Sequence, residues 1–156
     1  MSTSAIKLPH PRPCAFCAYL DGSRPFTFVA RSATTATLVT REQRGKPHLL
    51  VIPTTHRETI LHLTDKESAA LMIGVRNAAI AIDSTYHRPG ISVWQNNGEP
   101  ASQTIRHVHF HVAGTLDSGG TDWGEVKELP LADTERIAER IRANWPLPLS
   151  SDGLEV

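Results

Sequence analysis

The chain has 156 residues, of which 40% are hydrophobic and 21% charged, and its 16 basic and 16 acidic side chains give a formal net charge of zero. This length and composition are typical of one globular domain that folds without a disulfide framework. Because the chain has neither a basic excess nor an apolar run of about 20 residues, the sequence argues against a nucleic-acid polymer as partner and against a membrane-spanning protein.

Both ends of the chain are expected to lie outside the folded domain. We predict a flexible N-terminal segment over 1–13, a domain over 14–145 and a C-terminal tail over 146–156. The first segment has no continuous apolar stretch and does not resemble a signal peptide, so a cytoplasmic location is expected. In that compartment Cys14 and Cys17, spaced Cys-x-x-Cys, stay reduced, which favours a metal site or a redox pair over a structural disulfide.

Three β-strands are predicted in the first third of the chain. The β-branched and aromatic runs at 26–30 and 35–40 suit neighbouring antiparallel strands, and a third strand is predicted at 48–52. Pro53 should end that strand because proline cannot donate to a β-ladder. A turn of helix and a loop are expected over 54–63.

The strongest helix signal begins at Thr64. Thr64 and Glu67 have the spacing of a capping box, and apolar residues then recur on one helical face as far as Ile82. The helix should end near Tyr86, because the Pro-Gly pair at 89–90 breaks the helical pattern.

Two further strands and one helix complete the predicted elements. A strand is expected at 91–95, before a polar loop, and the strict alternation over 105–113 predicts another strand. A last helix should start at Asp133 or Thr134 and stop before Pro146. Strands outnumber helices and the connections are too short for repeated parallel crossovers, so we predict an α+β fold with an antiparallel sheet.

The predicted strand over 105–113 carries a row of histidines. His107, His109 and His111 alternate with apolar residues, which places three imidazoles on one face of the strand about 6.5 to 7 Å apart. Neutral imidazole is a nucleophile, a general base or a metal ligand. One ring can attack phosphorus while a neighbour binds the phosphate or its leaving group, and backbone N–H groups of the loop 96–104 can stabilise the charge. A polar strand face exposed to water is the alternative.

Three segments resemble the histidine triad (HIT) superfamily. Residues 107–113 fit its signature, in which three histidines alternate with apolar residues. The polar loop 96–106 and the strand 47–56, with its Val-Ile-Pro, are similar to two further segments in the order that the family has them. The resemblance covers roughly 14–115. It implies a HIT-like α+β fold, with a five-stranded antiparallel sheet and two main helices, and a homodimer.

The resemblance also implies an enzyme. The expected activity is that of a nucleotide hydrolase or nucleotidyl transferase at the α-phosphate of a nucleotide conjugate, either a phosphoramidate or a dinucleoside polyphosphate. His109 would attack phosphorus and form a covalent nucleotidyl-histidine, His111 would bind the phosphate or protonate the leaving group, and His48 would support the row. No organic cofactor is implied. The residues that match the substrate-binding positions are Asn96, Gln103, Thr104 and His111.

Zinc is implied by the same resemblance. A subset of bacterial members binds a structural zinc through a Cys-x-x-Cys pair, a later histidine and the first triad histidine. Two thiolates and two imidazoles form a closed tetrahedral set, which suits structural rather than catalytic Zn²⁺. The alternative is a pair of buried free cysteines with a surface histidine. The matching residues are Cys14, Cys17, His56 and His107.

The sequence departs from the family pattern near the expected nucleotide. Thr40 stands close to the position of an acidic residue that usually binds the ribose hydroxyls, and Glu42 has the wrong register to replace it. Ser102 stands where glycine is usual, which adds a Cβ to the phosphate loop. Arg41 and Arg44 add positive charge, which favours a substrate with additional phosphates.

Two other functions remain open. The altered ribose segment is consistent with a non-catalytic, zinc-stabilised protein that binds a nucleotide or a partner. A metalloenzyme that uses His107, His109 and His111 as joint ligands requires the three rings to converge. Trp94 and Trp123 either line a base pocket or pack within the protein.

Overall fold

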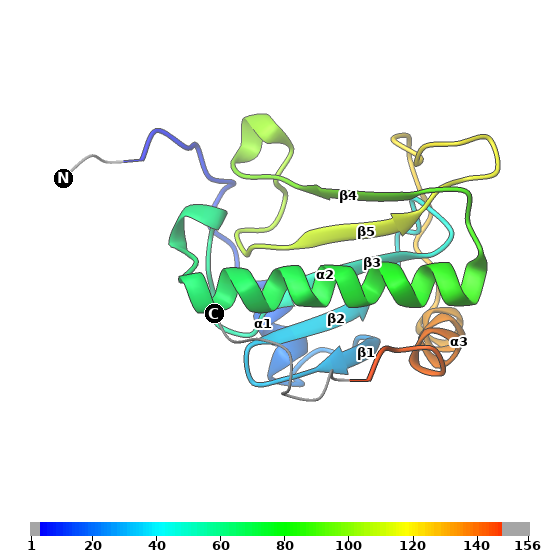
Figure 1. The fold of residues 1–156 in the computed structure, drawn as a ribbon. Helices are drawn as coiled ribbons and strands as arrows, with labels where there is room; N and C mark the ends of the chain where they lie inside the picture. Colours follow the sequence, from blue (N-terminus) through cyan, green and yellow to red (C-terminus); the bar gives the residue numbers. More distant parts are fainter. Residues whose placement is uncertain (1–3, 148–156) are drawn as a thin grey trace.

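A five-stranded antiparallel sheet forms the centre of the fold in the computed structural model, which describes residues 4–147 (Figure 1). The strand order is β1-β2-β3-β5-β4, and every neighbouring pair is antiparallel. The strands are β1 (Phe28–Arg31), β2 (Thr35–Val39), β3 (His48–Pro53), β4 (Ile91–Gln95) and β5 (Phe110–Gly114). The helices are α1 (Ala15–Leu20), α2 (Asp65–Tyr86) and α3 (Leu131–Arg142), with short 3-10 turns η1 (Ile60–His62) and η2 (Glu99–Ala101). The predicted α+β class is confirmed.

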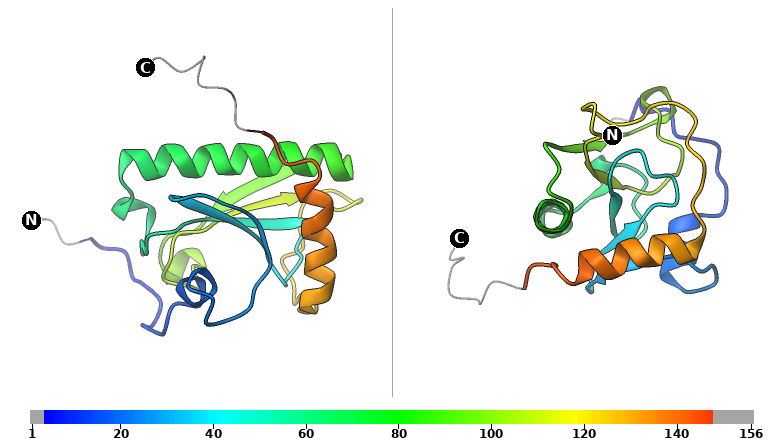
Figure 2. Two further views of the ribbon diagram at one scale, coloured as in Figure 1. Left: turned by 90° about the horizontal axis from the view of Figure 1, so that it is seen from below. Right: turned by 90° about the vertical axis from the view of Figure 1, so that its right-hand side faces the viewer.

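The two faces of the sheet carry different layers. α2 lies along one face, where its apolar side packs on alternate residues of the central strands, such as Leu49 and Val51. The intervening residues Leu50 and Ile52 face the short helix α1 on the other side. α3 packs across the β1 end of the sheet (Figure 2). His111 pairs with Leu50 across β5 and β3, so it lies on the face opposite α2.

α2 begins and ends as predicted. The Thr64 hydroxyl accepts the Glu67 N–H at 3.2 Å, and the Glu67 carboxylate accepts the Thr64 N–H at 2.8 Å, which completes a capping box. The same carboxylate binds the Arg57 guanidinium at 3.0 Å. The helix ends at Tyr86, and His87 adopts a left-handed conformation with φ 48°. α2 is therefore fixed at its start to the segment that follows β3.

The predicted strand over 105–113 is wrong in its first half. β5 begins only at Phe110, because the preceding backbone finds other partners. The Val108 N–H donates to the Arg57 carbonyl at 2.7 Å, and the His107 N–H donates to the Ile105 carbonyl at 2.8 Å. The alternation persists in the burial of Val108, which belongs to the core beneath α2.

The predicted start of the last helix is also wrong. α3 begins at Leu131 with Pro130 as its N-cap, so Asp133 and Thr134 lie within the first turn. Thr134 does not cap the helix because its hydroxyl is buried and shares a hydrogen bond of 2.7 Å with the Thr27 hydroxyl. Sequence spacing identified the helix, and a tertiary contact determined its start.

The N-terminal segment runs alongside the loop after β4. Residues 4–13 contain neither helix nor strand, and the Lys7 carbonyl accepts the Glu99 N–H at 2.7 Å. The predicted C-terminal tail over 146–156 falls outside the described residues from 148 onwards. None of the helices within 4–147 combines the length and apolarity needed to cross a bilayer.

Candidate functional site

A cavity of about 360 Å³ opens on the sheet face opposite α2. Three of the predicted histidines line it, namely His48, His109 and His111, and Thr104 borders it. Its remaining wall includes aromatic and basic side chains, which suit a ligand with a flat apolar group and an anionic group. This wall includes Phe16, Tyr19, Phe26, Arg24, Arg41 and Arg44.

His109 is held in one orientation by the backbone. The ring is only 6% exposed, and its Nδ1–H donates to the His107 carbonyl at 2.7 Å. Because Nδ1 carries the proton, Nε2 keeps a free lone pair. Burial lowers the pKa of His109 below its ordinary range, so the ring stays neutral. A neutral imidazole with a fixed tautomer is a nucleophile ready for use.

His111 and His48 form a hydrogen-bonded pair beside His109. His48 Nε2 lies 3.0 Å from His111 Nδ1. The other His48 nitrogen, Nδ1, lies 3.3 Å from the Arg44 backbone nitrogen and 3.1 Å from the Glu42 carbonyl oxygen. When His48 Nδ1 accepts the Arg44 N–H, His48 Nε2–H donates to His111 and leaves His111 Nε2 as a donor. Burial lowers the pKa of His48 to about 4 and that of His111 to about 2.

His48 is itself held by Gln43, which sequence analysis missed. The Gln43 side-chain oxygen accepts the His48 N–H at 2.8 Å, and its amide nitrogen donates to the His48 carbonyl at 2.9 Å. The same amide donates to the Thr40 carbonyl at 2.6 Å. No pattern in the sequence distinguishes this glutamine from a surface residue, because its partners depend on the fold of the turn.

Trp94 and Trp123 lie beside the histidines and do not line the cavity. The Trp94 ring stacks on the His111 ring, with centroids 4.5 Å apart and planes 3° apart. Trp123 is 72% exposed, and its ring centroid lies 5.6 Å from that of Trp94. Of the two roles that the sequence left open, packing is the one found for Trp94, whereas the exposed Trp123 neither lines this cavity nor lies in the core.

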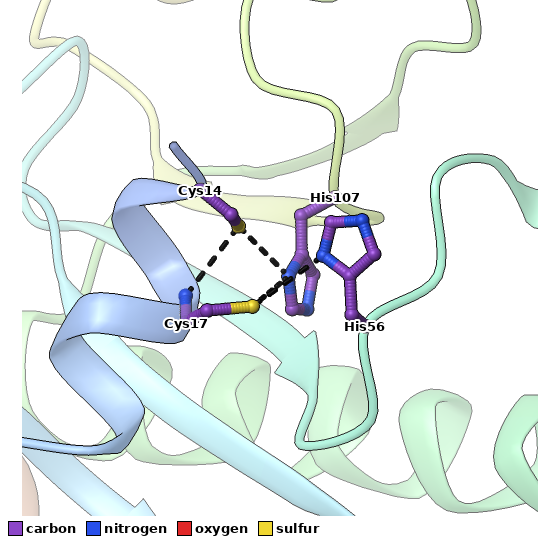
Figure 3. A group of neighbouring side chains, drawn as sticks. All are labelled: Cys14, Cys17, His56 and His107. Carbon is purple, nitrogen blue, oxygen red and sulfur yellow. Dashed lines mark hydrogen bonds between the residues drawn. The ribbon is translucent and has the colours of Figure 1, made fainter. Parts of the chain in front are cut away.

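Four predicted metal ligands converge beside α1 (Figure 3). Cys14 Sγ lies 3.3 Å from His107 Nδ1, Cys17 Sγ lies 3.7 Å from the same nitrogen, and Cys17 Sγ lies 3.4 Å from His56 Nδ1. The candidate ligand atoms all lie within 4.8 Å of one another. Sulfur and nitrogen ligands of a tetrahedral zinc are roughly 3.5 Å apart. The donor set and its spacing therefore fit this metal.

His107 presents the correct nitrogen to the cysteines. Its Nε2–H donates to the Pro53 carbonyl at 2.9 Å, which leaves the Nδ1 lone pair directed at the two thiols. Because both ring nitrogens of His107 are engaged, this residue cannot share a metal with His109 and His111. The alternative of a catalytic metal on the three triad histidines is wrong for this reason.

The four predicted substrate-binding residues do not all reach the cavity. His111 and Thr104 border it. The Asn96 side chain instead donates to the Ala101 carbonyl at 2.6 Å. Gln103 is buried at 2% exposure, and both ends of its amide bind backbone groups, so it shapes the loop.

Ser102 occupies the position where a glycine is usual, and its backbone is left-handed with φ 66°. This conformation favours glycine because a Cβ crowds the following carbonyl oxygen. The serine therefore retains the backbone conformation that a glycine would adopt without strain.

The altered ribose segment lies at the cavity as expected. Thr40, Glu42 and the two arginines all line it. Both carboxylates beside it are paired, since Glu42 binds Arg44 at 3.2 Å and Glu128 binds Arg41 at 3.1 Å. Neither acid is therefore free of a cationic partner.

Known proteins resemble this chain in sequence and in fold. Residues 23–117 match the HIT domain. The chain is 32% identical over 113 residues to Protein hit of Bacillus subtilis, an alignment that covers 70% of this chain and 78% of that protein. It is 32% identical over 99 residues to a protein of Schizosaccharomyces pombe named adenosine 5′-monophosphoramidase, with 64% and 71% covered. A Zn-bound histidine triad family protein from Mycobacterium smegmatis shares the fold, with a TM-score of 0.74, 24% identity, and 85% and 92% of the two chains covered.

Proposed function

The chain belongs to the HIT domain family, and on that premise we propose that it is a nucleotide hydrolase or nucleotidyl transferase. The substrate is a nucleotide conjugate, either a phosphoramidate or a dinucleoside polyphosphate, and the reaction takes place at its α-phosphate. The Schizosaccharomyces pombe relative, named adenosine 5′-monophosphoramidase, supports the phosphoramidate class. The aromatic side chains that line the cavity suit a nucleobase, and the arginines that line it suit phosphate.

The proposal is carried by one observation, the hydrogen bond from His109 Nδ1–H to the His107 carbonyl. This bond makes Nε2 the nucleophilic atom, and the ring lines the cavity in which the phosphate would bind. Attack by Nε2 forms a P–N bond while the bond from phosphorus to the leaving group breaks. The product is a covalent nucleotidyl-histidine, and Nδ1–H continues to donate to the same carbonyl.

His111 supplies and then recovers the proton. An anionic phosphate beside its ring favours the imidazolium. In that state His48 Nδ1–H donates to the Glu42 carbonyl, His111 Nδ1–H donates to His48 Nε2, and His111 Nε2–H donates to the leaving group. This proton passes to the nitrogen or oxygen of the leaving group as its bond to phosphorus breaks. In the second step a water molecule attacks phosphorus, its proton passes to His111, and the bond to His109 breaks. The cycle therefore returns both histidines to their starting states, and Thr104 borders the phosphate throughout.

Zinc would be held by the two cysteines of α1 and its N-cap, together with His56 and His107. All four ligands come from the chain, so the ion would be structural and would leave no coordination site for substrate. Its contribution is to fix the His107 ring and hence the carbonyl that orients His109.

A homodimer is part of the same proposal. β4 is an edge strand, and Val93 on it is 47% exposed. The outer side of α2 exposes Met72, Ile73 and Ile80. An open strand edge beside an exposed apolar surface supports pairing of two copies through this side. Light scattering of the purified protein tests it, and a monomer mass at micromolar concentration would contradict it.

The function is tested by intact-protein mass spectrometry after brief reaction with adenosine 5′-phosphoramidate and a denaturing alkaline quench, because the P–N bond of a nucleotidyl-histidine hydrolyses in acid. The wild-type protein should gain the mass of an adenylyl group and release AMP. His109→Ala should do neither, whereas the exposed His10→Ala should behave as the wild type does. AMP release by His109→Ala at the wild-type rate would refute the mechanism. Nucleotide binding by the wild type without adduct or release would favour a binding protein instead.

A further inference from the structure

Trp94 faces the proposed proton donor directly. It lies on the edge strand β4 and is the cross-strand partner of His111 on β5. The two rings are nearly parallel, at 3°, with centroids 4.5 Å apart. The Trp94 ring also lies 5.2 Å from the His48 ring, at 34°. One indole therefore borders both members of the histidine pair.

The stack on Trp94 restricts a tilt of the His111 ring that the hydrogen bond to His48 still allows. A ring held through a single nitrogen can still tilt about that bond, and within residues 4–147 the one side-chain hydrogen-bond partner of His111 is His48 Nε2, 3.0 Å from Nδ1. His109 approaches the His111 ring edge-on at 5.0 Å and 66°, which leaves room for such tilting. A parallel indole restricts the plane of the imidazole itself.

The indole also suits the charged form of His111. Proton donation to a leaving group requires the imidazolium, and an aromatic face stabilises a cation stacked on it. The charged and titratable groups around this ring are His48, His109 and Arg44, all of which are basic. These three basic groups oppose a positive charge on His111, whereas the face of the neutral Trp94 ring stabilises it.

We propose that Trp94 is a positioning residue for proton transfer by His111. The indole holds the imidazole in the plane in which Nδ1 faces His48, and this leaves Nε2 for the leaving group. The inference rests on the proposed function for the role of His111 as proton donor. The Trp123 ring, in the loop after β5, lies beside that indole, with the two centroids 5.6 Å apart.

The test compares two substrates that differ in their need for a proton. Adenosine 5′-phosphoramidate must have its leaving amine protonated, whereas the p-nitrophenyl ester of AMP expels a stable anion. Trp94→Leu should lower kcat on the phosphoramidate about 10- to 100-fold with little change in KM. It should keep most of the activity on the ester. Trp94→Phe should retain most activity on both, because an aromatic face remains.

Leu61→Ala is the control, because this apolar side chain is exposed on η1 and lies outside the cavity and the proposed dimer surface. It should leave both rates unchanged. Equal losses by Trp94→Leu on both substrates would indicate a purely structural role and would overturn the inference. Unchanged rates on both would overturn it as well.

A spectroscopic readout separates this inference from the proposed function. Nitrogen-15 spectra of the imidazole rings should show sharp His111 signals in the wild type and exchange broadening in Trp94→Leu, with no change in Leu61→Ala. If no variant or wild-type protein gives His109-dependent AMP release, the proposed function fails and these spectra alone decide whether Trp94 restrains His111. Identical His111 signals in the wild type and Trp94→Leu would refute the restraint.

Discussion

Replacement of Gln103 by alanine should destabilise the fold rather than merely weaken ligand binding. The side-chain oxygen accepts the Gly98 N–H at 2.7 Å, and the amide nitrogen donates to the Glu58 carbonyl at 2.7 Å and to the Ile105 carbonyl at 2.9 Å. Two backbone groups, the Gly98 N–H and the Glu58 carbonyl, therefore depend on one side chain that is 2% exposed, because the Ile105 carbonyl also accepts the His107 N–H. At about 1 to 2 kcal/mol for each group left unsatisfied, the free energy of unfolding should fall by about 2 to 4 kcal/mol.

Urea unfolding followed by circular dichroism measures this loss. Asn96→Ala is the matched control in the same loop, because it removes one exposed hydrogen bond to the Ala101 carbonyl. That variant should lose only about 0.5 to 1.5 kcal/mol. Gln103→Glu should also be strongly destabilised, since one of its oxygens would face two carbonyls.

One outcome would contradict a structural role for Gln103. If Gln103→Ala unfolds at the same urea concentration as the wild type but binds AMP more weakly, the side chain contacts the ligand directly. The expectation from the family resemblance would then be right, and the loop would owe its shape to other contacts.

Three further outcomes are expected. The purified protein should carry one zinc ion per chain by elemental analysis, and Cys17→Ser should lose the metal and several kcal/mol of stability; metal-free wild-type protein of equal stability would argue against a structural ion. Because burial lowers the pKa of His48 to about 4, only the unfolded chain binds this proton between pH 6.5 and 4. The free energy of unfolding should therefore decrease as the pH is lowered from 6.5 to 4, by at most about 1.4 kcal/mol per pH unit, and His48→Gln should reduce this slope. An equal slope in the variant would contradict the lowered pKa of His48. Ser102→Gly should raise the melting temperature, since relief of the left-handed serine outweighs the added chain entropy by about 0.5 to 1 kcal/mol, whereas Ser102→Ala should not; equal melting temperatures would show that the serine is unstrained.

Local signals in the sequence were sufficient for the long elements. The Thr64 capping box and the apolar face behind it predict α2 because both are encoded within a few turns of helix. The helix α1, with Cys17 within it, was not predicted, since six residues carry too little periodicity to be recognised. The start of β5 was misplaced because the Val108 N–H finds the distant Arg57 carbonyl instead of a neighbouring strand.

The candidate site could also be predicted from the sequence only in part. Family resemblance predicts the four metal ligands, and the structure brings them together although they come from three separate segments. The role of Trp94 could not be predicted, because its stack on His111 depends on the register between β4 and β5. Gln103 was assigned to the phosphate, although its partners lie 5, 45 and 2 residues away and consist of backbone alone.

One short segment after β3 positions much of the site. Residues 53–58 contain the metal ligand His56, and their carbonyls accept hydrogen bonds from the stretch that leads into β5. The segment is itself anchored to the start of α2 by the ion pair between Arg57 and Glu67. The Pro53 carbonyl accepts His107 Nε2–H, the Arg57 carbonyl accepts the Val108 N–H, and the Glu58 carbonyl accepts the Gln103 side-chain N–H.

This arrangement couples the candidate metal site to His109, the proposed nucleophile. His107 contributes its ring to the cysteines and its carbonyl to His109, so any shift of the ring moves the acceptor that fixes the His109 tautomer. Loss of the metal should therefore lower activity through geometry, although the ion would touch no substrate. His107 thus supplies both a ring nitrogen of the candidate zinc site and the carbonyl oxygen that orients the His109 ring.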